Sequence, residues 1–125
     1  MNLVDSSGYL EYFTGGPNAN IFAPIIADLN HLIVPTICIY EVFKRTLQQL
    51  GQNTALSAAA LLQQGKVIDL DFEIALNSAK LSSELKLPMA DSIILATARK
   101  YNAIIWTQDI DFAGLENVKL IPWRQ

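Results

Sequence analysis

Cysteine and histidine are scarce in this sequence of 125 residues, with one of each. A single cysteine excludes an internal disulfide and is typical of a reducing compartment. Cys38 lies inside the apolar run 37–43, so we expect it in the core. Because His31 is the sole histidine and the chain offers no other obvious base for a thiol, a catalytic cysteine is disfavoured.

Long apolar runs are also missing. No stretch approaches the roughly 18 consecutive apolar residues of a membrane span. The start of the sequence lacks the basic segment of a signal peptide, and Asp5 interrupts its apolar stretch. No repeat, low-complexity tract or long linker divides the chain. We therefore expect a cytoplasmic protein without membrane contact, folded as one domain over residues 1–125.

A basic excess, the usual footprint of a nucleic-acid-binding protein, is absent too, since the formal net charge is −3. Of the 12 acidic residues, however, four are candidate metal ligands, which leaves 8 acidic against 9 basic residues. Two bound divalent ions would change the formal charge from −3 to +1. The composition therefore neither requires nor excludes an RNA partner.

Apolar residues are plentiful, at 51% of the chain, which predicts a substantial core. Short apolar runs alternate with segments of helical period. We expect strands at residues 3–4, 31–34, 67–70, 103–106 and 119–121. We expect helices at residues 8–13, 19–29, 35–50, 54–64 and 89–101. A further helix is expected to end at residue 85, with either Asp69 or Asp71 as its N-cap. This alternation predicts an α/β sandwich with a parallel sheet covered by helices on both faces.

Four carboxylates stand beside these core-forming segments. Asp5 and Asp109 each follow an expected strand, and ligands of parallel sheets collect beyond the carboxyl ends of the strands. Asp91 and Glu41 share the apolar faces of their helices by the i, i+3, i+4 rule. Each acid alone could be a helix cap, a residue that complements a helix dipole, or a solvated side chain. Together they favour a shared Mg²⁺ or Mn²⁺ site, because these ions prefer carboxylate oxygens.

The order and spacing of these acids resemble the successive motifs of a PIN domain. The resemblance runs through nearly the whole chain and rests on four segments: residues 4–7 (VDSS), 40–42 (YEV), 87–92 (LPMADS) and 105–112 (IWTQDIDF). The size is similar to that of single-domain VapC ribonucleases of type II toxin–antitoxin modules. The resemblance implies a PIN-like three-layer α/β/α sandwich with a central parallel sheet, and a Mg²⁺- or Mn²⁺-dependent endoribonuclease.

The same resemblance implies roles for individual residues. Asp5, Glu41, Asp91 and Asp109 would be both the metal ligands and the catalytic acids. Thr107 would orient a carboxylate or water, Ser6 or Ser7 would support Asp5, and Asp111 would play a supporting part. A two-metal site of this kind needs no histidine. The implied partners are an RNA substrate, a small cognate antitoxin and a second copy of the chain in a homodimer. Candidates for the antitoxin groove are Ile21, Phe22, Ile25, Ile26, Phe43 and Leu47.

Two other functions compete with this interpretation. A PIN-like module could bind RNA or protein without catalysis, although the complete set of acids argues against that. Phosphoryl transfer through an aspartyl intermediate, as in proteins similar to haloacid dehalogenases, is disfavoured because Ser7 replaces the second acid of the expected Asp-x-Asp. Lys44, Arg45, Arg99 and Lys100 could contact RNA phosphates or could be ordinary solvated residues near helix ends.

Overall fold

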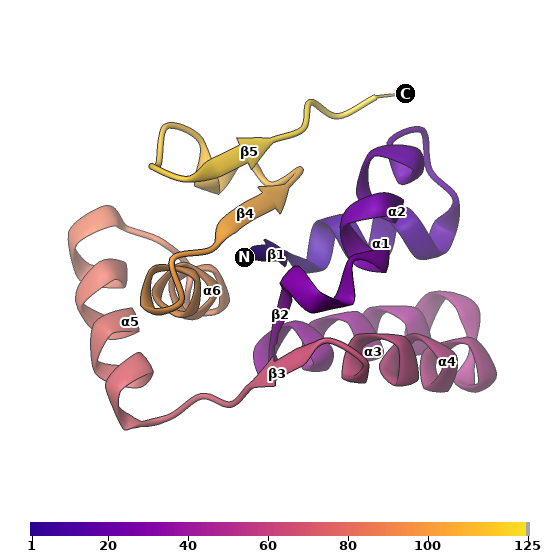
Figure 1. Cartoon of the computed structure of the whole chain (residues 1–125), viewed down its shortest axis with the longest axis horizontal. Coiled ribbons are helices and arrows are strands. Elements are labelled where there is room, and N and C mark those ends of the chain that lie inside the picture. The colour runs from indigo at the N-terminus through magenta and orange to yellow at the C-terminus, as the bar shows by residue number, and fades with distance from the viewer. Residues whose placement is uncertain (125) are drawn as a thin grey trace.

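The computed structural model describes residues 1–124, which form one parallel sheet and the helices around it (Figure 1). The strands are β1 (Asn2–Val4), β2 (Leu32–Pro35), β3 (Lys66–Ile68), β4 (Ile104–Thr107) and β5 (Val118–Leu120). The helices are α1 (Ser6–Thr14), α2 (Ala19–Ala27), α3 (Thr36–Leu50), α4 (Gln52–Gln63), α5 (Phe72–Leu85) and α6 (Met89–Lys100). Two short 3₁₀ helices, η1 (Leu29–His31) and η2 (Ile110–Phe112), complete the order.

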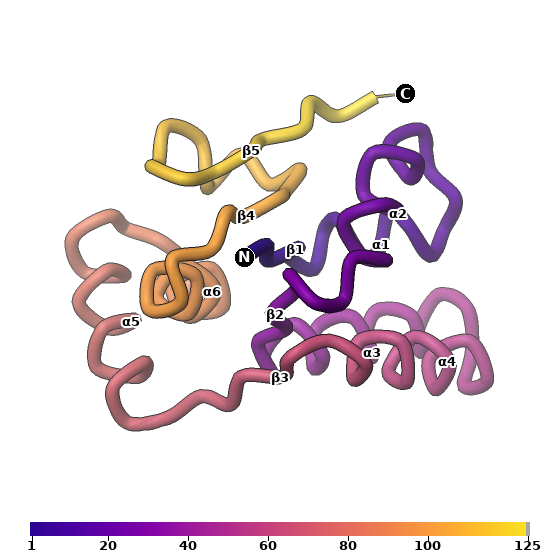
Figure 2. The backbone as a smooth tube through the Cα atoms, viewed as in Figure 1, coloured from indigo at the N-terminus to yellow at the C-terminus, as the bar shows by residue number. Residues whose placement is uncertain are grey.

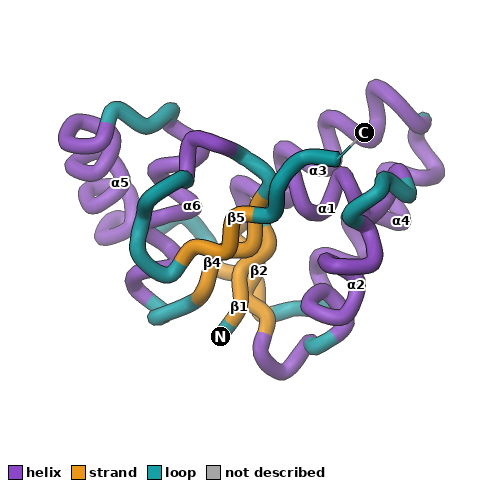
Figure 3. The backbone as a smooth tube through the Cα atoms, turned by 90° about the horizontal axis from the view of Figure 1, so that it is seen from above, coloured by secondary structure: helices purple, strands orange, loops and turns teal. Residues whose placement is uncertain are grey.

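The sheet has the strand order β3-β2-β1-β4-β5, and every neighbouring pair is parallel. Helices α5 and α6 lie to one side of the strands and α1 to α4 to the other (Figure 3). The smooth backbone trace of Figure 2 shows the same separation, with the segment after β5 running toward the α1–α2 region. The expected α/β/α sandwich with a parallel sheet is therefore confirmed. No helix within residues 1–124 is long and apolar enough to cross a membrane.

Alternating strand residues build two separate cores. Leu3, Ile33 and Ile105 belong to a cluster with α5 and α6, whereas Val4 and Val34 belong to a second cluster with α1, α2 and α4. Because both faces of a parallel sheet are covered, both sets of side chains must be apolar. This explains the nearly unbroken apolar runs of the sequence. Cys38 is fully buried in the first cluster, as expected.

Helix boundaries follow local chemistry. Asp5 accepts a hydrogen bond from the Gly8 amide and so starts α1 at Ser6, two residues before the expected position. The helix ends at Gly15, whose φ of 66° is accessible to glycine at little cost. Of the two acids expected to cap α5, Asp71 does so through the Ile74 amide. His31 lies in η1 rather than in β2, exposed to solvent and within 3.0 Å of Asp28.

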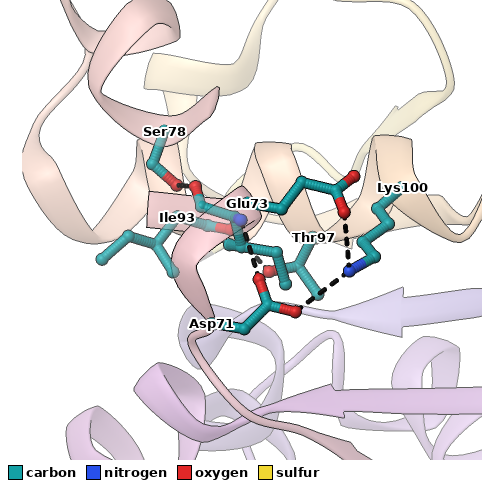
Figure 4. Close-up of polar contacts among 7 residues, drawn as sticks. Asp71, Glu73, Ser78, Ile93, Thr97 and Lys100 are labelled. Carbon is teal, nitrogen blue, oxygen red and sulfur yellow. Dashed lines mark hydrogen bonds and ion pairs between the residues drawn. The ribbon is translucent and has the colours of Figure 1, made fainter. Parts of the chain in front are cut away.

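An ion pair joins the two helices on one face of the sheet. Lys100 at the end of α6 reaches Asp71 at 3.0 Å and Glu73 at 3.3 Å, both at the start of α5 (Figure 4). The hydrogen bonds of the cap and the ammonium group lower the pKa of Asp71 below its usual value. Lys100 therefore already has protein partners, which disfavours its expected alternative role at RNA phosphates.

Two residues proposed for a docking groove on α2 are not available. Phe22 is fully buried and Ile26 is 3% exposed, because both face the sheet in the second core cluster. That part of the prediction is wrong. Leu47, by contrast, is 42% exposed, and Ile21, Ile25 and Phe43 are partly exposed.

Candidate metal centre

The expected ligands arise from elements that meet at the carboxyl edge of the sheet. Asp5 directly follows β1, and Asp109 follows the neighbouring strand β4. Glu41 lies in the second turn of α3, the helix that begins where β2 ends, and Asp91 lies in the first turn of α6. Parallel strands deliver such residues to one edge however far apart they are in the sequence.

Asp5 is buried, at 3% exposure, and is held by three donors. The Thr107 hydroxyl donates to Oδ2 at 2.6 Å, the Ser7 hydroxyl donates to Oδ1 at 2.7 Å, and the Gly8 amide donates to Oδ1 at 3.1 Å. Burial raises the pKa of Asp5 to about 6, although the three hydrogen bonds oppose this rise. The carboxylate is thus fixed in position while its charge is poorly solvated.

The two hydroxyls that hold Asp5 also hold the segment after β4. The Asp109 amide donates to the Thr107 hydroxyl at 2.8 Å, and the Gln108 amide donates to the Ser7 hydroxyl at 2.9 Å. Ser6 donates to the Glu41 carboxylate at 2.5 Å. Thr107, Ser6 and Ser7 therefore position acids of three different elements relative to one another. Ser7 rather than Ser6 is bonded to Asp5, and the supporting roles expected for these residues stay predictions.

Three carboxylates form a tight group at the site. Asp91, Asp109 and Asp111 each offer an oxygen, and these oxygens all lie within 4.8 Å of one another. Asp5 and Glu41 are not part of this group of three. Asp111 thus lies with Asp91 and Asp109, and its expected supporting part stays a prediction. Its own amide donates to Asp109 at 2.9 Å.

The charges at the site are not balanced by cations. None of the salt bridges formed within residues 1–124 involves Asp5, Glu41, Asp91, Asp109 or Asp111. Burial raises the pKa of Asp91 to about 7, and the carboxylates of Asp109, Asp111, Asp5 and Glu41 add to the rise. Asp91 and the four acids that add to its raised pKa have hydroxyl and amide donors but no salt-bridge partner within residues 1–124, and such a group matches the oxygen-rich donor sets of Mg²⁺ and Mn²⁺.

A second polar cluster, which the sequence patterns did not reveal, lies behind this edge. Glu11 is 9% exposed and accepts a hydrogen bond from the Asn18 amide at 2.7 Å. The fully buried Asn18 side chain donates to the Gln108 side chain at 2.6 Å. The only sequence signal was a glutamate within an apolar helix and a glutamine between Thr107 and Asp109, and neither identifies its partner.

The sequence was compared with family profiles and with curated proteins. A sequence profile described as the PIN domain matches residues 3–117. Sequence comparison with curated proteins gives no significant match.

Solved structures are similar over 94% to 100% of the chain. A chain of a toxin–antitoxin complex from Klebsiella pneumoniae is 25% identical, with a TM-score of 0.82 and 100% of both chains covered. FitAcB from Neisseria gonorrhoeae is 20% identical, with a TM-score of 0.77 and 100% of both chains covered. VapC20 from Mycobacterium tuberculosis, described as a Sarcin-Ricin loop cleaving toxin, is 16% identical, with a TM-score of 0.75 and coverage of 94% and 98%. The last two similarities establish a common fold.

Proposed function

The chain belongs to the PIN domain family, and from this premise we propose that it is a divalent-metal-dependent endoribonuclease, the toxin of a type II toxin–antitoxin module. We propose further that residues 1–125 act as one PIN domain. VapC20, which has the same fold, is named for cleavage of the sarcin–ricin loop. Support from this chain itself comes from its acidic site.

One observation carries the proposal: Asp91, Asp109 and Asp111 bring oxygens within 4.8 Å of one another at the carboxyl edge of the sheet. Asp5 and Glu41 are near enough to add to the raised pKa of Asp91, and no cation of residues 1–124 forms a salt bridge with any of the five acids. Asp5 is buried, Glu41, Asp91 and Asp109 are half-buried, and Asp111 is exposed. Uncompensated charge that is partly removed from water is costly, so a protein retains such a cluster only where something offsets the cost. A divalent cation fits the donor set, because all the side chains that converge are oxygen ligands. Asp91, Asp109 and Asp111 would hold it, and Asp5 and Glu41 would complete the ligand set.

When bound, such ions activate a water molecule and neutralise the charge that develops on the phosphodiester. The protein's contribution is to hold its oxygens in place. Thr107 and Ser7 fix both oxygens of Asp5, and Ser6 fixes one oxygen of Glu41. Preorganised ligands of this kind need no rearrangement when substrate arrives. Loss of either hydroxyl at Asp5 would loosen a metal ligand without removing it.

We propose two protein partners, a small antitoxin and a second copy of this chain. The similar chain from Klebsiella pneumoniae comes from a toxin–antitoxin complex, and two further structures with the same fold are VapBC complexes with DNA. After the buried residues Phe22 and Ile26 are set aside, exposed apolar side chains remain at Leu47 and Leu50 on α3 and Leu56 on α4, with exposures of 42%, 42% and 52%. These adjacent helices offer an apolar face to the antitoxin.

The test is cleavage of RNA by the purified protein. We expect Mg²⁺ or Mn²⁺ to support cleavage, a chelator to stop it, and added metal to restore it. Asp5→Asn should retain the fold, because the amide oxygen still accepts hydrogen bonds, but should lose most activity. RNA binding without cleavage at any metal concentration would instead support the non-catalytic alternative. Undiminished cleavage by a folded Asp5→Asn protein would contradict the proposed site.

A further inference from the structure

A hollow of about 460 Å³ adjoins the acidic site. Its polar lining comes from Ser7, Gln108 and Asp109, and its apolar lining from Ile110 and residues 120–123. Trp123 and Ile110 are each 73% exposed, which is unusual for large apolar side chains beside a cluster of acids. Asp109 belongs both to the group of carboxylates and to the wall of the hollow. A molecule bound at the acids can therefore extend directly into this hollow.

The side-chain amide of Gln108 is oriented by a chain of hydrogen bonds. The carbonyl oxygen of Pro122 can only accept, so Asn18 must present its NH₂ group there, at 2.9 Å. The same NH₂ group donates to Gln108 Oε1 at 2.6 Å. This leaves Gln108 Nε2, a donor, on the opposite side of the amide. Asn18 is itself fixed, because its backbone amide donates to the buried Glu11 carboxylate.

Gln108 Nε2 has no hydrogen-bond partner among residues 1–124, although Gln108 is only 9% exposed and lines the hollow. The fully buried side-chain atoms without a hydrogen bond within residues 1–124 are Tyr9 Oη and Asn18 Oδ1, so the free donor of Gln108 retains contact with solvent at the hollow. A residue held so firmly, with its free donor at the hollow, is suited to an acceptor atom of a ligand. No lysine or arginine lines the hollow, so it offers no basic side chain to a phosphate group.

We propose that this hollow is a base-binding subsite, which takes one unpaired base of the RNA next to the cleaved phosphodiester. The base stacks at Trp123, and an acceptor atom on its edge receives a hydrogen bond from Gln108 Nε2. Aromatic side chains bind unpaired bases in this way, and single-stranded RNA exposes both the face and the edge of each base. The inference rests on the proposed function, because the phosphate beside that base is the one bound at the acids.

The test is a double-mutant cycle between Trp123 and the base. Wild type and Trp123→Ala are compared on short single-stranded oligoribonucleotides that carry either a normal base or an abasic ribose beside the cleaved bond. We expect loss of that base to lower the kcat/KM of wild type by roughly tenfold, and that of Trp123→Ala by less than about twofold. Phe72→Ala, which removes an 80% exposed aromatic ring on α5, should keep the full effect of the base.

A second variant examines the hydrogen bond. Gln108→Glu keeps the acceptor that faces Asn18 but replaces the free donor with an acceptor. The added charge affects all oligonucleotides alike, so the ratio of kcat/KM between bases isolates the contact. We expect this ratio to change in Gln108→Glu and to stay constant in Phe72→Ala.

Several outcomes would overturn the subsite. One is an equal loss from the abasic substitution in wild type and Trp123→Ala. Another is a Trp123→Ala protein that cuts normally but binds antitoxin weakly, which would make the hollow a peptide site. If wild type cleaves no RNA at all, that result contradicts the proposed function but does not yet test the subsite. The same cycle is then measured on oligonucleotide affinity, and absence of coupling or of binding overturns the subsite as well.

Discussion

Acidic residues near the two ends of helix α6 are in opposite electrostatic environments. At the carboxyl end, Lys100 pairs with Asp71 and Glu73 (Figure 4), and the pKa of Asp71 is lowered. At the amino end, Asp91 faces other carboxylates without a basic partner, and its pKa is raised to about 7. Helix α6 therefore lies between a compensated acidic pair at the start of α5, next to its carboxyl end, and an uncompensated acidic group at its own amino end.

This difference separates fold from function. The pair at Lys100 is exposed to water, where ion pairs contribute little to stability because solvent and salt screen them. The acids around Asp91 oppose folding, since they are partly desolvated and repel one another. Selection for stability alone would not keep them. The comparison predicts that changes at the two ends of α6 will differ in kind as well as in size.

The largest expected effect is on catalysis. Asp91→Asn removes a charged ligand with almost no change in shape and should lower RNA cleavage by roughly 100-fold or more, because charge stabilisation by metal contributes several kcal/mol. Lys100→Gln, the matched change at the other end, should stay within about threefold of wild type. Both variants are assayed at saturating Mn²⁺ with circular dichroism as the check on folding. Equal activity of the two variants would contradict a catalytic role for Asp91 that Lys100 does not share.

A smaller effect is expected on metal-dependent stability. Mn²⁺ at a hundredfold excess over its dissociation constant should stabilise wild type by about 2.7 kcal/mol if only the folded state binds it. Lys100→Gln should gain the same amount, and Asp91→Asn should gain less. Thermal melts of the three proteins with and without Mn²⁺ measure this directly. Three identical gains would show that Asp91 does not bind the metal.

The smallest effect concerns pH in the presence of a chelator. Asp5 and Asp91 have folded pKa values of about 6 and about 7, above the value of about 3.9 for an unfolded aspartate. Folding therefore favours their protonated forms. Their penalty is absent below about pH 4 and complete above about pH 7, so these groups lower stability as pH rises. Asp91→Asn should lack part of this penalty and melt a few degrees above wild type at pH 8.

Below about pH 4 the melting temperatures of wild type and Asp91→Asn should converge, since Asp91 is then mostly protonated in the folded and the unfolded state alike. Comparing the two proteins at each pH cancels the titration of groups away from the acidic site, including the oppositely shifted Asp71. A difference between them that does not depend on pH would mean that Asp91 titrates normally.

The sequence by itself determined the secondary structure and the edge where the acids meet. Short apolar runs and apolar patterns of period 3.6 are local properties, so the strands and helices were predictable to within a few residues. Parallel strands must share one carboxyl edge, and this placed Asp5 and Asp109 together without any coordinates. The motifs around Glu41, Asp91 and Thr107 resemble those of PIN domains, and this resemblance led to the predicted nuclease activity.

Only the tertiary structure decided which side chains touch. Apolar residues of α2 read alike in the sequence, yet Phe22 and Ile26 face the sheet while Ile21 and Ile25 stay partly exposed, because packing sets the rotation of the helix. Gln108 and Asn18 are 90 residues apart, so no local pattern could pair them. The close approach of Asp111 to Asp91 likewise depends on how η2 turns after β4. Contacts between distant segments are fixed by chain packing, which a local pattern does not encode.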